Sequence, residues 1–149
     1  MAMIHLGGRL VDAATARIDP ADRGFLLADG VFETLRVHDG EAFKLEAHLA
    51  RLAAGARILG LPAPDAGEIA LAVSDTLDAN KLREASLRIT LTRGAGRRGL
   101  LPPRDMEPTL LIAASPAAER SSAPMTAHIV NTRRNEHSPL SRVKSLAYL

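Results

Sequence analysis

Apolar and polar residues alternate in two long stretches of the chain, residues 31–37 and 86–93, and this period of two predicts β-strands. Residues 109–114 form a continuous apolar run, which is typical of a strand in the middle of a sheet. One face of the first stretch carries Val31, Glu33, Leu35 and Val37, and the core-facing side of the second carries Leu87, Ile89 and Leu91.

Two pairs of turn-forming residues predict β-hairpins. Gly7-Gly8 separates residues 3–6 from residues 9–11, which are expected to pair with each other. Asp39-Gly40 is a strong type I′ turn signal, so residues 42–45 are expected to return as the partner of the strand before it.

After this second hairpin the apolar period changes from two to steps of three and four. This pattern continues over residues 45–59 and predicts an amphipathic helix that ends at Gly60. Asp65 and Glu68 have the spacing of a capping box, so a second helix is expected from there to about Asn80.

The remaining segments are expected to be irregular, with one exception. Residues 19–27 are punctuated by Pro20 and Gly24, which predicts a loop. Serine, alanine and proline are frequent in residues 116–123, which are the best candidate for a linker between domains. Residues 125–131 are interpreted as the first strand of a second domain.

The order of these elements, strands then two helices then strands, indicates an α+β fold. We expect residues 1–115 to form a small N-terminal domain with two layers, an antiparallel or mixed sheet and two helices. After the linker, residues 124–149 are expected to begin a second, larger domain, whose remainder lies outside this sequence.

Composition excludes several classes of function. Apolar residues make up 46% of the chain, enough for a real core, but aromatic residues only 3%, and the net charge is +2, so a nucleic-acid-binding protein is not expected. The absence of cysteine excludes disulfides and thiolate metal sites, and the histidines lack metal-ligand spacing. No signal peptide or membrane-spanning apolar run is present, which indicates a cytoplasmic protein.

Residues 94–99 have the glycine spacing of a dinucleotide-binding turn and come after a predicted strand. That motif also requires a helix directly afterwards, whereas Pro102 and Pro103 come next here and disfavour its first turns. We therefore expect a flexible loop that carries Arg97 and Arg98 at the end of the sheet.

Two cationic residues are candidates for a binding site, and each has an alternative interpretation. Lys144 has Val143 and Leu146 as apolar neighbours, and an apolar setting favours the neutral amine that a Schiff-base lysine requires. The alternative is that Lys144 faces water at the start of an amphipathic helix. Arg51, on the first predicted helix, has a fork of donors suited to a phosphate, or is an ordinary surface residue.

Five motifs, in the same order along the whole chain, make it similar to the class IV aminotransferases, which are the fold-type IV pyridoxal-phosphate enzymes. That family includes branched-chain and D-amino acid aminotransferases and aminodeoxychorismate lyase. The motifs are Asp22-Arg23-Gly24-Phe25, Asp29-Gly30-Val31-Phe32-Glu33-Thr34, Phe43-x-Leu45-x-x-His48-Leu49-x-Arg51-Leu52, Thr92-Arg93-Gly94, and Ser138-Pro139-Leu140-x-x-x-Lys144-Ser145-Leu146-x-Tyr148-Leu149.

The resemblance implies a role for each of five residues. Lys144 forms the Schiff base with the aldehyde of pyridoxal 5'-phosphate and moves the proton between substrate and cofactor carbons. Arg51 binds the cofactor phosphate, and Tyr148 bonds to the phenolic oxygen. Phe32 is the active-site aromatic residue, and Arg98 binds the substrate carboxylate as in D-amino acid aminotransferases.

Two positions depart from the family pattern. The histidine that accompanies Arg98 in D-amino acid aminotransferases is Leu100 here, and Ala147 stands where an asparagine is usual.

The resemblance further implies an aminotransferase that acts on amino acids and 2-oxo acids as a homodimer. Aminodeoxychorismate lyase, which releases pyruvate to give 4-aminobenzoate, is the alternative. Family members extend well beyond the lysine, and this sequence has five residues after Lys144. A third interpretation is therefore a fragment that is catalytically incomplete by itself.

Overall fold

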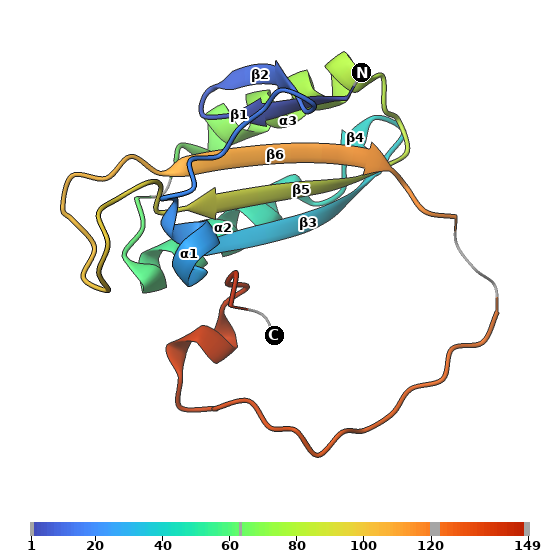
Figure 1. Ribbon diagram of the computed structural model, residues 1–149. Helices are drawn as coiled ribbons and strands as arrows, with labels where there is room; N and C mark the ends of the chain where they lie inside the picture. Colours follow the sequence, from blue (N-terminus) through green and yellow to red (C-terminus); the bar gives the residue numbers. More distant parts are fainter. Residues whose placement is uncertain (1, 63, 120–122, 148–149) are drawn as a thin grey trace.

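A six-stranded sheet and two long helices form the two layers of the computed structural model, which describes residues 2–62, 64–119 and 123–147. The strand order is β2-β1-β6-β5-β3-β4, and every neighbouring pair is antiparallel (Figure 1). The strands are β1 (Met3–Leu6), β2 (Arg9–Asp12), β3 (Gly30–His38), β4 (Glu41–Ala42), β5 (Ala85–Thr92) and β6 (Thr109–Pro116). The helices are α1 (Arg23–Leu27), α2 (Leu45–Leu59) and α3 (Ala66–Asn80), and η1 (Pro139–Arg142) is a 3-10 turn.

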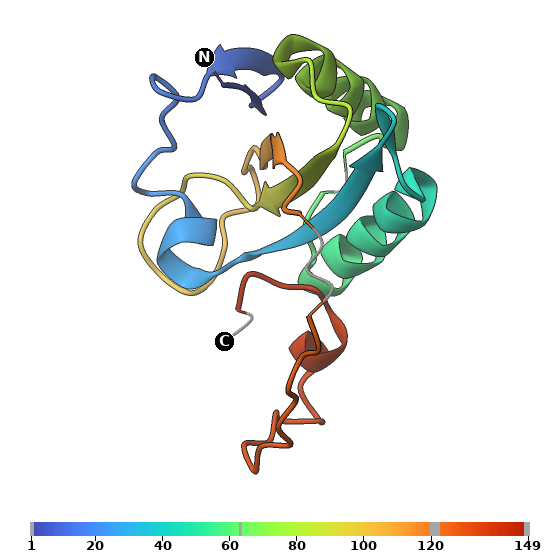
Figure 2. The same cartoon turned by 90° about the vertical axis from the view of Figure 1, so that its right-hand side faces the viewer.

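Helices α2 and α3 cover the same face of the sheet (Figure 2). The core lies between these layers, because alternate residues of β3 and β5 and the apolar stripes of both helices face each other. Its buried members include Val31, Leu35, Val37, Leu49, Leu52, Ala56, Ile69, Ala72, Val73, Leu77, Leu87, Ile89, Leu91 and Ile112. The predicted α+β fold class is confirmed, and the sheet is antiparallel throughout.

Both predicted hairpin turns are present and have the backbone that such turns require. Gly7 and Gly8 have φ angles of 55° and 83°, and Asp39 and Gly40 have 53° and 84°, so each turn holds two successive residues with positive φ. The strand predicted for residues 42–45 is shorter than expected: β4 ends at Ala42, and α2 begins at Leu45.

Two further predictions from the sequence are wrong. Residues 19–27 are not all irregular, because Asp22 caps the short helix α1 by accepting a hydrogen bond from the Gly24 amide at 2.7 Å. Residues 125–131 form no strand, and Met125 and Ile129 are fully exposed. Strands need a neighbour for their backbone groups, and among the described residues no strand lies beside this segment.

None of the helices among the described residues is long and apolar enough to cross a membrane.

A partly buried ionic cluster joins the start of β3 to the end of β5. The Asp29 carboxylate accepts hydrogen bonds from Arg23 Nε at 2.9 Å and from Arg93 Nε at 2.7 Å. Arg93 also donates to the carbonyl oxygens of Leu59 and Gly60 at 2.6 and 2.9 Å, which are free acceptors at the C-terminal end of α2. This cluster therefore joins the sheet, α1 and α2 at the end of the sheet where β3 begins.

Replacing Asp29 with asparagine is expected to lower the free energy of unfolding at pH 7 by up to about 3 kcal/mol, because the buried Arg23 and the partly buried Arg93 lose their counter-ion. Burial acts to raise the pKa of Asp29, but the hydrogen bonds and charges of Arg93 and Arg23 outweigh it and hold the pKa below its ordinary value. A lowered pKa in the folded state contributes stability above the unfolded pKa of about 4, and that contribution disappears as the pH falls.

The difference in unfolding free energy between wild type and Asp29→Asn should therefore shrink in urea titrations carried out below pH 4. Asp78→Asn, at an exposed position of α3, is the matched control and should stay within about 0.5 kcal/mol of wild type. A gap that is equally large at pH 3 and pH 7 would contradict the assignment to charge.

Candidate functional site

The segment that carries Lys144 pairs with the free edge of β3. After β6 the chain makes a wide arc and returns through η1 to the lower edge of the sheet (Figure 1). The Phe32 amide donates to the Lys144 carbonyl oxygen at 3.0 Å, and the Leu146 amide donates to the Gly30 carbonyl oxygen at 2.9 Å. These two bonds place Ser145 opposite Val31 in an antiparallel bridge, so Lys144 is fixed by the sheet itself.

Side-chain packing fixes this segment from the helix side. Val143 is buried, and its Cγ1 atom lies 3.0 Å from the place that a Cβ of Gly55 would occupy. The same imagined Cβ would lie 3.2 Å from Val31 Cγ1. Glycine at this position of α2 therefore leaves the space in which Val143 packs between the helix and β3.

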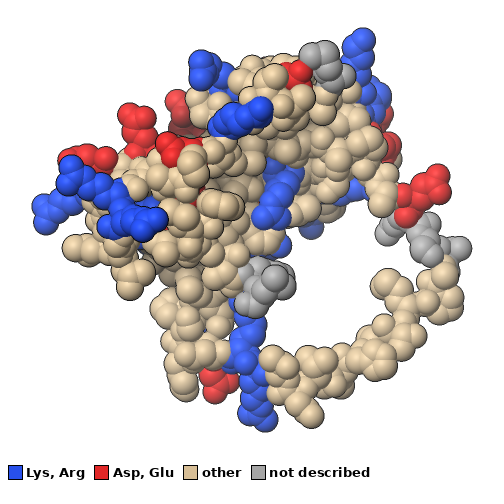
Figure 3. All heavy atoms as spheres, viewed as in Figure 1, with Lys and Arg blue, Asp and Glu red and all other residues tan. Residues whose placement is uncertain are grey.

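Lys144 and Arg88 both contact the ring of Phe32, on the face of the sheet opposite the helices. Lys144 Nζ lies 4.4 Å and Arg88 Cζ 3.8 Å from the ring centroid, which is cation-π distance. Burial lowers the pKa of Arg88, which forms no ion pair with any described residue and donates to Thr90 Oγ1 at 3.2 Å. Lys and Arg side chains appear in the middle of this face in Figure 3.

Arg51 lies at the same edge of β3, on the helix side. It projects from α2, one turn before Gly55, and its guanidinium binds the Glu33 carboxylate at 2.6 and 2.7 Å. Because successive residues of a strand point to opposite faces, Glu33 contacts Arg51 on one side of β3 and Phe32 contacts Lys144 on the other. The predicted phosphate ligand and the predicted cofactor lysine thus contact adjacent residues of one strand, from opposite sides of it.

Arg98 lies elsewhere, in the loop between β5 and β6. Residues 96–100 and α1 line a hollow of about 250 Å³, and Arg98 is exposed there. The loop is held by Arg23, whose guanidinium donates to the carbonyl oxygens of Gly99 and Leu100, both at 2.8 Å. No helix comes directly after residues 94–99, as expected. Tyr148, the fifth predicted site residue, lies outside the described residues.

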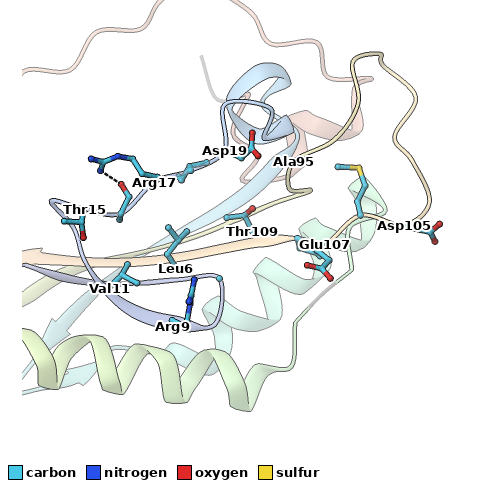
Figure 4. A pocket seen from close by; sticks show the side chains of 15 residues that line it. Leu6, Arg9, Val11, Thr15, Arg17, Asp19, Ala95, Asp105, Glu107 and Thr109 are labelled. Atoms are coloured by element: carbon cyan, nitrogen blue, oxygen red, sulfur yellow. Dashed lines mark hydrogen bonds between the residues drawn. The ribbon is translucent and has the colours of Figure 1, made fainter.

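A hollow of about 680 Å³, larger than the one beside Arg98, is separate from all of these residues (Figure 4). It lies between the β1–β2 hairpin, residues 15–19 and residues 105–109. Its charged lining mixes both signs, from Arg9 and Arg17 to Asp105 and Glu107, and holds no nucleophile or base paired for catalysis. Size alone therefore does not identify the site.

Three residues near the proposed site were not predicted from the sequence to belong to it: Glu33, His48 and Arg88. Glu33 had a visible signal, because it is an acid on the core-facing side of an otherwise apolar strand face, where an unpaired carboxylate would be costly. Arg88 had none, since an arginine on the outward face of a strand is normally an ordinary solvated residue.

Comparison with known proteins gives the family. Residues 30–149 match the family described as amino-transferase class IV. The chain is 38% identical over 149 residues to a putative branched-chain-amino-acid aminotransferase of Methanocaldococcus jannaschii, covering 98% of this chain and 52% of that protein. It is 30% identical over 152 residues to the aminodeoxychorismate lyase of Bacillus subtilis, covering 99% and 52%.

A solved structure supports the same assignment. A hypothetical aminotransferase from Mycobacterium tuberculosis in a PLP-bound form is 32% identical, with a TM-score of 0.66, over 77% of this chain and 39% of that one. The chain spans about half the length of the two curated relatives. The matched family extends over β3, both helices that come after it and the lysine segment, and the chain therefore belongs to the class IV aminotransferases.

Proposed function

We propose that the protein is a pyridoxal-phosphate-dependent aminotransferase that moves an amino group between an amino acid and a 2-oxo acid. The observation that carries this proposal is that Lys144 and Arg51 contact adjacent residues of β3, Phe32 and Glu33, where the strand begins. An amine and a guanidinium beside the start of one strand suit the two ends of pyridoxal phosphate, its aldehyde and its phosphate.

The donor groups of this edge fit such a cofactor. Arg51 binds Glu33 through Nε and Nη2 and keeps Nη1 for an anion, and its side chain is 59% exposed. The Ser145 hydroxyl is buried and has no hydrogen-bond partner among the described residues, so a further donor lies beside Lys144. When bound, pyridoxal phosphate supplies an electron sink for negative charge on the substrate carbon.

Each residue near this edge of β3 is proposed to have its own role. Lys144 holds the cofactor aldehyde and moves the proton at the substrate Cα. Phe32 shields the amine from water on one side and favours a cation that approaches its ring face. Arg88 has no counter-ion among the described residues and is proposed to bind a substrate carboxylate, alongside or instead of Arg98. Tyr148 is proposed to bond to the phenolic oxygen of the cofactor.

The assembly and location belong to the same proposal. Exposed apolar side chains gather on α1 and in the β5–β6 loop: Phe25 and Leu26, and Leu100 and Leu101, are 76%, 52%, 82% and 89% exposed. An exposed apolar surface of this kind supports a homodimer. The enzyme is further proposed to be cytoplasmic. Residues 1–115 are proposed as the small domain and residues 124–149 as the beginning of the large one, joined by the linker at 116–123.

Aminodeoxychorismate lyase is the second candidate, and the similarity to the Bacillus subtilis lyase favours it. Both reactions use the same lysine, but the lyase releases pyruvate from aminodeoxychorismate and leaves 4-aminobenzoate, with no 2-oxo acid acceptor.

An assay with both kinds of substrate is expected to separate these candidates. The protein loaded with pyridoxal phosphate is incubated with a panel of amino donors plus 2-oxoglutarate, and separately with aminodeoxychorismate. Glutamate formation that requires donor, acceptor and cofactor supports the aminotransferase. Pyruvate release without an acceptor supports the lyase instead, and absence of cofactor uptake by the 149-residue chain supports a fragment that is incomplete by itself.

A further inference from the structure

Glu33 is a fully buried carboxylate next to the proposed cofactor site. It lies on the helix-facing side of β3 with 0% exposure, among residues of the apolar core. An ionised carboxylate is costly to bury unless it is paired and hydrogen-bonded. The core face of this strand would be filled more easily by a valine or leucine, so the acid needs a reason beyond packing.

The partners of Glu33 are two donors from α2. Arg51 Nε donates to Oε1 at 2.7 Å and Arg51 Nη2 donates to Oε2 at 2.6 Å, which is the two-pronged pairing of a guanidinium with a carboxylate. His48 Nδ1 donates to Oε2 at 2.7 Å. Arg51 Nη2 and His48 Nδ1 lie 3.3 Å apart, but both are donors aimed at Glu33, so they do not bond to each other.

This arrangement fixes which side of the Arg51 guanidinium faces outward. The edge formed by Nε and Nη2 lies on Glu33, and the opposite side, with Nη1, is left for another partner. Without Glu33, a half-exposed arginine would sample many rotamers and would lose that freedom on binding an anion. A side chain already held in place avoids that cost.

We propose that Glu33 is a positioning residue that holds Arg51 in the orientation in which it binds the phosphate of pyridoxal phosphate. This rests on the proposed function. The Glu33 carboxylate also repels a phosphate. Its charge therefore lowers the affinity for pyridoxal phosphate, whereas its hydrogen bonds to Arg51 raise that affinity. The effect of the hydrogen bonds dominates, because they order the long side chain of Arg51, whereas Arg51 and His48 screen the negative charge of Glu33.

The test compares binding of pyridoxal phosphate with binding of pyridoxal, which has the same aldehyde but no phosphate. Both are titrated into the full chain, and the ratio of the two dissociation constants isolates the phosphate. Glu33→Gln removes the charge and the paired hydrogen bonds to Arg51. Glu33→Asp keeps the charge but is one methylene too short to form those hydrogen bonds. Both variants are expected to lower the preference for pyridoxal phosphate about three- to tenfold, the cost of ordering one long side chain.

Binding of pyridoxal should stay within about twofold of wild type in both variants, because the phosphate contact is absent there. Glu84→Gln is the matched control: Glu84 also bridges an arginine and a histidine, Arg36 and His38, at the other end of β3 and far from Lys144. Arg51→Gln should lose the preference altogether, and Glu33→Gln should add nothing in that background.

The outcomes separate this inference from the function on which it rests. Suppose that Arg51→Gln abolishes the preference for pyridoxal phosphate over pyridoxal, but a folded Glu33 variant retains it. That result overturns the positioning role of Glu33 and leaves the enzyme assignment intact. A preference that rises in Glu33→Gln and is unchanged in Glu33→Asp shows that only charge acts, which also overturns it. Wild-type protein that does not discriminate pyridoxal phosphate from pyridoxal removes both proposals.

Discussion

Lys144→Ala is expected to lose at least about 10²–10⁴-fold in the proposed transaminase activity, because it removes the amine that is proposed both to hold the cofactor and to move the substrate proton. The variant should also lose the visible absorbance that covalently bound pyridoxal phosphate gives. The fold should survive, since Lys144 contributes its backbone carbonyl to the bond with Phe32, and alanine retains that carbonyl.

Two controls make this result specific. Lys144→Arg keeps a cation against the Phe32 ring but offers no amine to an aldehyde, so it should be as inactive as alanine. Lys81→Ala changes an exposed lysine just after α3, at the opposite end of β5, and should leave the absorbance and the rate unchanged. Retention of the absorbance band in Lys144→Ala, with the protein folded, would assign the cofactor to another amine.

The elements of the fold could be predicted because their signals are local. The stripe over residues 45–59 gave α2 with both ends correct, and Asp65 gave the start of α3, since periodicity and capping depend on a few neighbouring residues. Helix α1 was missed because five residues carry too little periodicity, and its cap at Asp22 is completed by Thr92 and Thr109, which are distant in sequence.

The site was predicted less completely, for a related reason. Lys144 and Arg51 are positioned by long-range contacts, with Phe32, Glu33 and Gly55, that no local pattern contains. Only the ordered motifs of the family suggested the proposal that the two residues act together. The roles of Arg88 and of Glu33 depend on which neighbours lie above each face of β3, which periodicity alone does not specify.

Strand β3 emerges as the scaffold of the proposed site. Its free edge receives the lysine segment, its outward face presents Phe32 to two cations, and its inward face presents Glu33 to Arg51. The ionic cluster at Asp29 lies directly before this strand and anchors its start to α1 and α2. A strand anchored in this way is a rigid mount, and rigidity is what positions reacting groups.

The second large effect is expected at Gly55, which lies on α2 outside the residues proposed to bind the cofactor. A leucine there would place its side chain in the space of Val143 and Val31, whose Cγ1 atoms lie 3.0 and 3.2 Å from the position of a Cβ. Overpacking of this kind costs about 1–3 kcal/mol. The contacts that hold the lysine segment include two backbone bonds, the buried side chains of Val143 and Ser145 and the contact of Lys144 with Phe32, and they are few compared with those of the core. We therefore expect the segment to detach from β3 while the helix–sheet core remains folded.

Detachment predicts two measurable changes in Gly55→Leu. Activity should fall by about 10²-fold or more, because displacing a reacting group by about 1 Å has that effect. The Phe32 amide, which donates to the Lys144 carbonyl in the wild type, should lose its protection from hydrogen exchange. Ala50→Leu places the same side chain on the exposed side of α2 and should change neither quantity. Protection of the Phe32 amide in an inactive Gly55→Leu protein would show that the helix acts on the site by another route than the seating of Val143.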